Sequence, residues 1–213
     1  MILAIEPAYY RSVSQAHVEL DPTAFLHEIS NIGICFREKI FYPALVQNPD
    51  SFVWIYLHDG KTAGYIAGTK NARKLYHNII CFKPFLLALL VLKNICRRPC
   101  VLIEYLRIRG QLKHSHFKSD GRAEILSLGV LPEFRGKQFK AKYGVHIAQV
   151  LFQKATAVFR ERGVDRFIVM TAQSNEAANH FYRNQGCQLI RTQKFFHTPC
   201  NVFAGDLTSP PVG

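Results

Sequence analysis

The stretch Ala123-Glu-Ile-Leu-Ser-Leu-Gly-Val-Leu-Pro-Glu-Phe-Arg-Gly-Lys137 joins an apolar strand pattern to a short basic loop. The pattern predicts a strand over residues 124–130, a loop over residues 131–136 and a helix that begins near Lys137. The start of a helix presents unpaired backbone N–H groups and the positive end of the helix dipole, so it can bind a diphosphate. Arg135 and Lys137 would add positive charge to such a site. Taken alone, the same residues also fit a solvated turn.

The residues that follow predict an α/β arrangement. Apolar residues recur at helical spacing after Lys137, and Gly163 is suited to end that helix. The expected elements are, in order, a long helix (137–162), a buried strand (166–171), a short helix (175–185) and two last strands (187–196 and 201–207). This alternation is typical of a sheet with helices packed on it.

The first half predicts a strand, a helix and a hairpin. Residues 12–20 are interpreted as the first strand, and Asp21-Pro22-Thr23 as the start of the helix. Residues 52–57 and 62–68 predict two strands joined by the tight turn Asp59-Gly60.

The net charge of +12 is concentrated in one segment. The chain has the length of a single domain, expected to span residues 1–213 and to carry a basic helical insertion at residues 70–118. This insertion holds eleven basic residues and one acidic residue, Glu104. Its two prolines, Pro84 and Pro99, divide it into two expected helices, residues 85–98 and residues 101–112.

Two interpretations of the basic insertion stay open. An apolar surface between basic residues suits peripheral binding to an anionic membrane, such as the inner face of the cell membrane, where each charge contributes about 1 kcal/mol. A helical hairpin folded over a cleft of the domain, with its apolar residues completing the core, fits equally well. Nucleic-acid binding is disfavoured, because a recognised binding module is missing.

The cysteines and the apolar runs indicate a cytoplasmic protein. The six cysteines lack the spacing of a zinc site or of a small disulfide scaffold, so reduced thiols and no metal are expected. The longest charge-free apolar run, residues 85–92, is far shorter than the roughly 20 residues that span a bilayer. No charged region precedes the apolar start, so a secretory signal is not expected. The oligomeric state stays open, and a homodimer is compatible with the sequence.

A second motif lies some forty residues after the first. Asn175-Glu-Ala-Ala-Asn-His-Phe-Tyr-Arg-Asn-Gln-Gly-Cys187 follows the predicted strand at 166–171. Together the two motifs resemble the fourth strand, the pyrophosphate loop and the short helix of GNAT acetyltransferases. The resemblance covers nearly all of the chain except the basic insertion. It implies a mixed, mostly antiparallel twisted sheet, splayed between its fourth and fifth strands, with helices on both faces.

The resemblance also implies roles for individual residues. Tyr182 corresponds to the phenol that protonates the departing coenzyme A sulfur, a general acid. Glu124 lies where several members keep a carboxylate that accepts the proton of the amine, although a glutamate at a strand start is more often a surface residue. The backbone of Leu128 and Val130 would pair with pantetheine and polarise the acyl carbonyl. Asn175 either caps the short helix or, together with Ala178, binds the pantetheine arm, and these roles are compatible.

The pyrophosphate loop departs from the family pattern. A loop that starts at Arg135 gives the cofactor Arg135, Gly136, Lys137 and Gln138, but Gln138 and Lys140 then occupy positions where the family has small residues. The alternative places residues 143–148 at the loop, after an insertion of eight residues, which keeps Ala148 but loses the arginine. The first register is favoured because it follows the strand directly.

The sequence therefore predicts an acyl-CoA-dependent N-acyltransferase. Acetyl-CoA or another acyl-CoA would be the cosubstrate, no metal would take part, and the acceptor would be the primary amine of a small molecule such as an amino sugar. Two alternatives remain, a non-catalytic CoA-binding protein and a basic adaptor on a membrane or a nucleic acid that only shares the fold.

Overall fold

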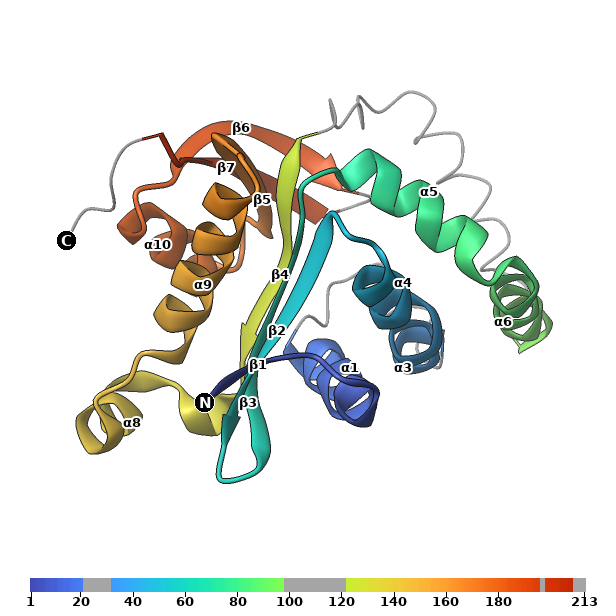
Figure 1. Ribbon diagram of the computed structural model, residues 1–213, viewed down its shortest axis with the longest axis horizontal. Helices are drawn as coiled ribbons and strands as arrows, with labels where there is room; N and C mark the ends of the chain where they lie inside the picture. Colours follow the sequence, from blue (N-terminus) through green and yellow to red (C-terminus); the bar gives the residue numbers. More distant parts are fainter. Residues whose placement is uncertain (21–31, 98–121, 196–197, 209–213) are drawn as a thin grey trace.

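The computed structural model describes residues 1–20, 32–97, 122–195 and 198–208. Seven strands form one sheet in the order β1-β2-β3-β4-β5-β7-β6 (Figure 1). The strands are β1 (Ile2–Ala4), β2 (Ser51–His58), β3 (Lys61–Thr69), β4 (Ala123–Val130), β5 (Arg166–Ala172), β6 (Gln188–Phe195) and β7 (Thr198–Asp206). Every neighbouring pair is antiparallel except β4 and β5, which run parallel.

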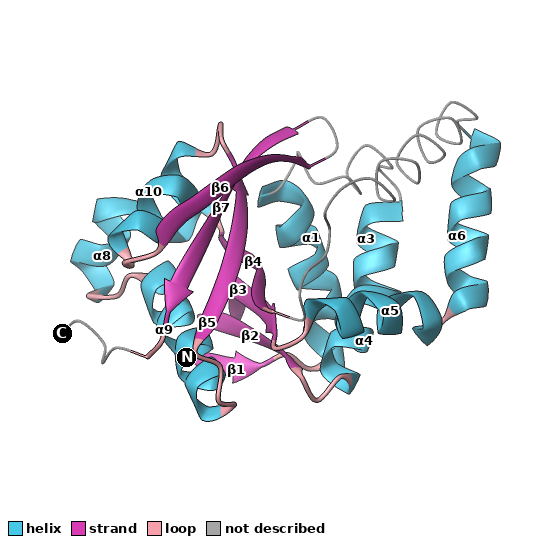
Figure 2. Cartoon of the chain, turned by 90° about the horizontal axis from the view of Figure 1, so that it is seen from above, coloured by secondary structure: helices cyan, strands magenta, loops and turns pink. Residues whose placement is uncertain are grey.

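Helices cover both faces of this sheet (Figure 2). One face carries α8 (Gly136–Tyr143), α9 (Ile147–Glu161) and α10 (Glu176–Asn184). The other carries α1 (Tyr10–Leu20), α3 (Ile32–Phe36), the π-helical turn η2 (Arg37–Phe41), α4 (Tyr42–Gln47), α5 (Ala72–Phe82) and α6 (Pro84–Arg97). Two short 3₁₀ turns, η1 (Pro7–Tyr9) and η3 (Pro132–Phe134), precede α1 and α8.

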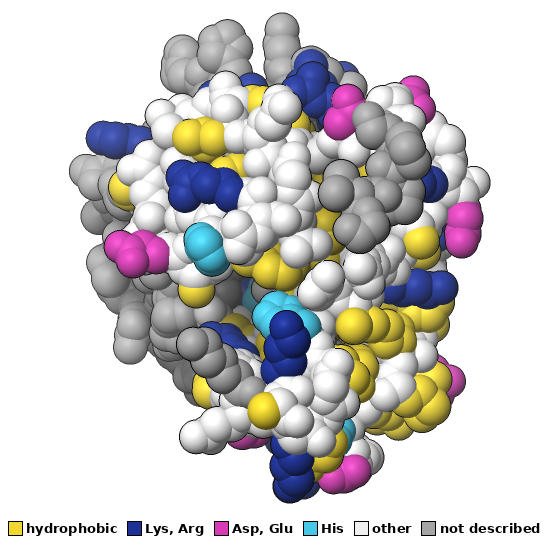
Figure 3. Space-filling view, turned by 90° about the vertical axis from the view of Figure 1, so that its left-hand side faces the viewer, with side chains coloured by type: hydrophobic (Ala, Val, Ile, Leu, Met, Phe, Trp, Pro, Cys, Tyr) yellow, Lys and Arg dark blue, Asp and Glu magenta, His cyan; other side chains and the backbone are white. Residues whose placement is uncertain are grey.

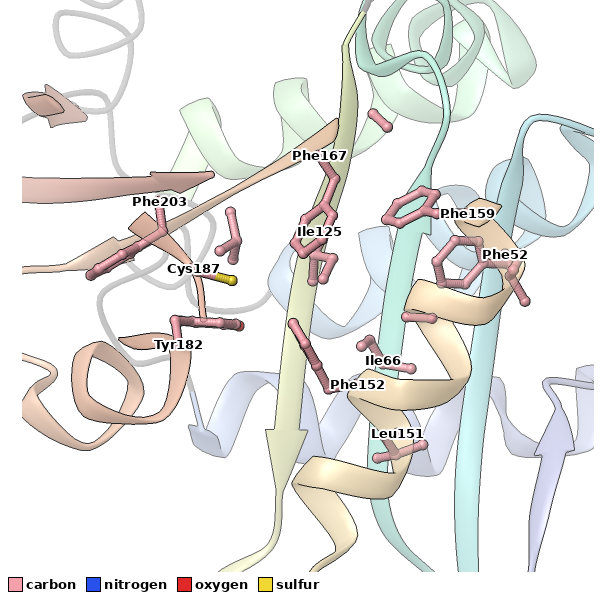
Figure 4. Close-up of a cluster of buried hydrophobic side chains, with 14 of the residues drawn as sticks. Phe52, Ile66, Ile125, Leu151, Phe152, Phe159, Phe167, Tyr182, Cys187 and Phe203 are labelled. Carbon is pink, nitrogen blue, oxygen red and sulfur yellow. The ribbon is translucent and has the colours of Figure 1, made fainter. Parts of the chain in front are cut away.

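Each face has its own hydrophobic core. On the α9 face, aromatic side chains meet between the helix and the sheet (Figure 4): Phe159 stacks on Phe167 at 5.6 Å and meets Phe52 edge to face at 5.1 Å between ring centroids. On the α1 face, α1, η2, α4 and α5 bury residues such as Val13, Ile40 and Leu75 against β2 and β3. Burial of this apolar surface is the main term that holds the helices to the sheet.

Most of the expected elements form, with three differences. Residues 12–20 were expected as a strand, but they lie in α1, whose residues Val13, Ala16 and Leu20 recur at helical spacing and face the sheet. The first strand is β1, three residues long, which the sequence pattern did not predict.

The second difference is that the long helix expected over residues 137–162 is two helices. Gly144 ends α8 in the left-handed conformation (φ +68°), and His146 then caps α9 by accepting a hydrogen bond from the Gln149 N–H at 3.3 Å. A side chain at residue 144 would be strained, so the glycine fixes the break.

The third difference lies in the basic insertion, which holds an unexpected helix, α5. Asn71 caps it by accepting a hydrogen bond from Lys74 N–H at 3.0 Å. The helix predicted at residues 85–98 is confirmed as α6, whereas the helices expected from Asp21 and at residues 101–112 lie wholly or partly outside the described residues. No helix within the described ranges is long and apolar enough to cross a membrane.

Candidate active site

The sheet opens between β4 and β5. These two strands pair only over Ala123–Ile125 and Phe167–Val169. Beyond these residues β4 continues along β3 while β5 continues along β7, so the parallel strands separate toward their carboxyl ends. A β-bulge marks the point of separation, because Ile125 pairs with Gly68 and Ser127 with Ala67, which leaves Leu126 as an extra residue.

A cavity of about 420 Å³ lies in this opening, and residues from both faces of the sheet form its walls. The lining residues are His17 and Leu20 from α1, Tyr65 from β3, Leu126, Ser127 and Leu128 from β4, Val169, Met170, Thr171 and Ala172 from β5, and Ser174, Asn175, Ala178 and Tyr182 around α10. A ligand in this cavity would therefore lie alongside the free edge of β4 and reach both helical layers.

Tyr182 forms part of the α10 wall. Its ring packs among Phe152, Phe181 and Phe203, and its hydroxyl end is directed toward β4 (Figure 4). Burial raises the pKa of the Tyr182 phenol above its usual range, and the nearby Cys187 thiol adds a smaller contribution in the same direction. The phenol is therefore held in its protonated form, as a hydrogen-bond donor at the cavity wall.

A parallel strand pair that splays over a cavity, with a tyrosine on the following short helix, matches the arrangement that the two sequence motifs implied. A model of the acetyltransferase (GNAT) family matches residues 12–187. The chain belongs to this family. The GNAT family uses acetyl-CoA as its cosubstrate.

Solved structures with the same fold include several GNAT enzymes. An N-acetyltransferase from Staphylococcus aureus Mu50 superposes with a TM-score of 0.59 at 14% identity, covering 98% of each chain. The ribosomal-protein-S18-alanine N-acetyltransferase from Escherichia coli gives 0.57 at 12% identity, covering 100% of this chain and 96% of that one. A ribosomal-protein-alanine N-acetyltransferase from Brucella melitensis gives 0.58 at 16% identity, covering 97% and 99%. No curated relative matches the chain in sequence.

These likenesses confirm the expected fold. The sheet is mixed and mostly antiparallel, it splays between its fourth and fifth strands, and helices lie on both faces. At these identities the likeness extends to the fold, and the site is argued from the residues of this chain.

The residues of the cavity fit the acyl and pantetheine part of acetyl-CoA. The wall combines apolar side chains such as Leu128 and Val169 with polar groups at the bulge and at the start of α10. Ser127 supplies a buried hydroxyl that has no hydrogen-bond partner among the described residues. A buried polar atom without a partner costs about 1–3 kcal/mol, so a ligand that binds this hydroxyl would recover that cost.

Four of the residues expected to bind cofactor or to act in catalysis line the same cavity, namely Leu128, Asn175, Ala178 and Tyr182. Asn175 caps α10, because its Oδ1 accepts a hydrogen bond from the Ala178 N–H at 3.1 Å. Asn175 therefore has the first of its two expected roles, as the cap of the short helix. Its place in the cavity wall is compatible with the second, binding of the pantetheine arm.

Glu124 lies in the closed part of the β4–β5 pair, where it is the Cα partner of Ile168, and it does not belong to the described cavity wall. Only 9% of its surface is exposed, and this burial raises the pKa of its carboxyl group to about 7. The proposed role as base stays a prediction. Ile125 separates Glu124 from Leu126, the first residue of β4 in the cavity wall, so the carboxyl group would have to act on the amine across that distance.

The residues of the favoured pyrophosphate loop lead into α8, away from the cavity. Arg135 turns back on the strand, and its Nε donates a hydrogen bond to the Val130 carbonyl. Gly136 opens α8 with φ +87°, and the exposed Gln138 lines, together with Arg135, a separate hollow beside the β2–β3 turn. The side chain of Lys137 lies outside what the structure describes. The assignment of Val130 and residues 135–138 to the cofactor stays a prediction.

Two further groups at the site were not predicted from the sequence. Asn179 is buried, and its amide donates to the carbonyl groups of Ala172, Gln173 and Asn175 at 3.0, 3.2 and 2.8 Å. Asn201 of β7 completes the network by donating to Asn179 Oδ1 at 2.8 Å. These two amides fix the start of α10 on the ends of β5 and β7, and so hold this wall of the cavity in place.

His17 is the second group, and it forms part of the α1 wall of the cavity. The sequence contained a signal for it, because Val13, Ala16, His17 and Leu20 follow helical spacing and so share one face. The interpretation of residues 12–20 as a strand concealed this face.

Proposed function

We propose that this GNAT protein transfers an acetyl or another short acyl group from acyl-CoA to the primary amine of a small molecule, directly and in a ternary complex. The observation that carries the proposal is the cavity between β4 and β5, which has walls on both faces of the sheet. A thioester in this gap would offer its carbonyl to an amine that arrives from the α1 side while its sulfur lies toward α10.

Tyr182 is the proposed general acid. The amine nitrogen forms a bond to the carbonyl carbon, the C–S bond breaks, and its electron pair leaves with the sulfur. Tyr182 then donates its hydroxyl proton to that sulfur, the nitrogen gives up one proton to a base or to solvent, and solvent restores the phenol. The burial that raises the pKa of the phenol would also raise the pKa of a CoA thiol beside it, which favours protonation of the departing sulfur.

We further propose that the cofactor diphosphate binds at the start of α9, in the register of residues 143–148. In support, α9 is the helix that packs on β2, β3 and β4, and the backbone N–H groups of Ile147 and Ala148 lie in its first turn. Figure 3 shows the face that carries α8 and α10, where Lys and Arg side chains are scattered rather than gathered in one patch. Backbone donors would therefore have to provide much of the binding.

The acceptor that we favour is an amino sugar linked to a nucleotide or a lipid. The chain carries a net charge of +12, and a basic protein attracts an anionic acceptor over a neutral one. The Escherichia coli and Brucella melitensis neighbours are named for alanine acetylation of ribosomal protein, so a peptide with an N-terminal alanine is the competing acceptor.

The test is release of free thiol from acetyl-CoA with three acceptors: an amino sugar, the same sugar linked to a nucleoside diphosphate, and a short peptide that begins with alanine. Tyr182→Phe should lower kcat about 100-fold or more and leave the calorimetric Kd for CoA unchanged, because only the proton donor is lost. Tyr56→Phe, on a half-buried tyrosine of β2 outside the cavity, is the matched control. An unchanged rate in Tyr182→Phe would remove the acid. CoA binding without thiol release from any acceptor would favour the non-catalytic alternative.

A second proposal concerns α6, which we expect to bind an anionic membrane from the cytoplasmic side. Phe85, Leu89 and Leu92 lie on one stripe of this helix and are 82%, 51% and 58% exposed. Lys83 and Lys93 are exposed near its two ends, and residues 70–97 contain no acidic residue. An apolar stripe with basic flanks is complementary to a lipid surface of negative charge.

Sedimentation with vesicles of phosphatidylcholine, with and without phosphatidylglycerol, tests this second proposal. The wild-type protein should bind only the anionic vesicles, and Lys83→Glu with Lys93→Glu should abolish binding. Lys140→Glu with Lys142→Glu makes the same charge change on α8 and should leave binding in place. Equal sedimentation with both vesicle types would contradict the proposal.

A further inference from the structure

His17 and Tyr182 lie on opposite walls of the cavity. His17 comes from α1, on one face of the sheet, and Tyr182 from α10, on the other. The gap between β4 and β5 lies between these faces. An acyl group held in this gap would therefore have a protonated phenol on the side of its sulfur and an imidazole on the side from which the amine arrives.

The His17 ring is held in one orientation. Its Nδ1 lies 3.0 Å from the Tyr42 hydroxyl, and its ring centroid lies 5.2 Å from that of Tyr65 and 6.3 Å from that of Phe41. Tyr42 is fully buried at the start of α4, so the hydrogen bond forms away from solvent. With Nδ1 engaged, Nε2 is the nitrogen that His17 can offer to a ligand in the cavity.

The surroundings of the ring keep it neutral. The titratable and charged groups around it are Arg37 of η2, Tyr42 of α4 and Tyr65 of β3. Burial, and then the positive charge of Arg37, hold the pKa of His17 well below its usual value. Either atom can be the donor in the contact between His17 Nδ1 and the Tyr42 hydroxyl; in the tautomer whose Nδ1–H donates, the lone pair of the neutral imidazole lies on Nε2 and can accept a hydrogen bond.

We propose that His17 is a catalytic residue for the acceptor, with Tyr42 as its positioning residue. This inference rests on the proposed acyl transfer. His17 Nε2 accepts a hydrogen bond from the incoming amine, which directs the nitrogen lone pair at the thioester carbon. As the N–C bond forms, the nitrogen becomes positively charged and far more acidic than the free amine, so its proton can pass to the weakly basic Nε2. The C–S bond breaks and the Tyr182 proton passes to the sulfur. Solvent restores both side chains after the products leave.

The position of His17 distinguishes it from Glu124. Both lie on the α1 side, but His17 lines the cavity whereas Glu124 lies below it, where β4 and β5 are still paired. The family resemblance pointed to the carboxylate, and the geometry points to the imidazole as the group that touches the amine.

The test compares His17→Asn with His180→Asn, a matched change on an exposed histidine of α10 outside the cavity. Asparagine can keep a polar contact near Tyr42 but has no atom in the place of Nε2. His17→Asn should lower kcat about 100-fold, the usual contribution of a positioned base, with the Kd for CoA unchanged. His180→Asn should behave as the wild type.

Tyr42→Phe removes the hydroxyl that contacts His17 Nδ1 and keeps the aromatic ring. It tests the positioning role, and it also tests the inference if His17→Asn does not fold. It should lower kcat about tenfold when the rate is divided by the concentration of CoA-binding sites measured by calorimetry, a loss that a smaller folded fraction would not produce. An unchanged kcat in either folded variant overturns this inference alone. A wild-type protein that neither binds CoA nor releases thiol would instead overturn the proposed acyl transfer.

Discussion

Replacing Glu124 by glutamine should change how the stability of the protein depends on pH. The carboxyl group of Glu124 is buried beneath the α1 face of the sheet, and its pKa is raised from the ordinary 4.5 to about 7 by the loss of hydration. Glutamine has nearly the shape of the protonated side chain but never ionises. The variant therefore removes the cost of a buried charge and little else.

The sign follows from proton binding. Between pH 4.5 and pH 7 the folded protein holds the Glu124 proton while the unfolded chain has lost it, so raising the pH favours unfolding. The loss of unfolding free energy due to Glu124 is nearly absent below pH 4.5, grows as the pH rises toward 7, and is nearly constant above pH 7. The shift from 4.5 to about 7 corresponds to about 3 kcal/mol in full, of which about 2.5 kcal/mol develops between pH 5 and pH 8.

The assay is urea denaturation of wild type and Glu124→Gln at pH 5 and pH 8. The difference in unfolding free energy between variant and wild type should be about 2–3 kcal/mol larger at pH 8 than at pH 5, in favour of the variant. For a chain of this length this corresponds to about 5–10 °C in Tm. Glu133→Gln, on an exposed glutamate of η3, is the control and should show no such difference. Equal pH dependence in wild type and Glu124→Gln would refute the assignment of the raised pKa to burial of this carboxyl group.

Three further substitutions test the framework of the site by urea denaturation. Gly68→Ala would place a Cβ atom 2.5 Å from the Phe52 ring and should cost about 1–3 kcal/mol, and a smaller cost would show that the ring moves freely. Gly144→Ala must adopt φ +68° and should cost about 1–2 kcal/mol, unless α8 and α9 merge into the one helix that the sequence predicted. Asn201→Leu leaves Asn179 Oδ1 without its donor and should cost about 1–3 kcal/mol and weaken CoA binding; unchanged CoA binding would contradict the proposed role of the amide network.

The second half of the fold was predictable because local pattern and tertiary structure agree there. β4, β5 and α10 form within a residue or two of their expected bounds, since apolar runs, Asn175 and Gly186 mark their ends. The strand predicted over residues 12–20 was wrong for the opposite reason, because a short apolar run fits either the strand or the helix period until the sheet beside it is known.

The break at Gly144 was hidden by the continuity of the apolar face. Phe139 and Tyr143 of α8 and Leu151 of α9 fit a single helical stripe, although Phe139 and Tyr143 pack on His58 of the β2–β3 hairpin and Leu151 packs on the sheet. A helical period in the sequence indicates which residues are buried, but it does not show whether they pack against the same part of the protein. The left-handed glycine was the one local sign of the break.

The candidate site was predictable where a motif carries it and not where distant elements meet. Tyr182 and Asn175 follow from one contiguous motif. Ser127 depends on the bulge, and His17 and Tyr42 meet across 25 positions of sequence because α1 packs against η2, directly before Tyr42. Proximity of this kind results from tertiary packing, which a single sequence does not display.

The three residue pairs that join β4 to β5 also have a mechanical consequence. The strands before this seam and those after it form two sheet halves that share a short ladder and the α9 core. A ligand that lies along the open edge of β4 takes the place of the missing strand contacts and connects the two halves. Such a ligand would restrain the motion of one sheet half relative to the other, because the ladder that joins them is only three residue pairs long.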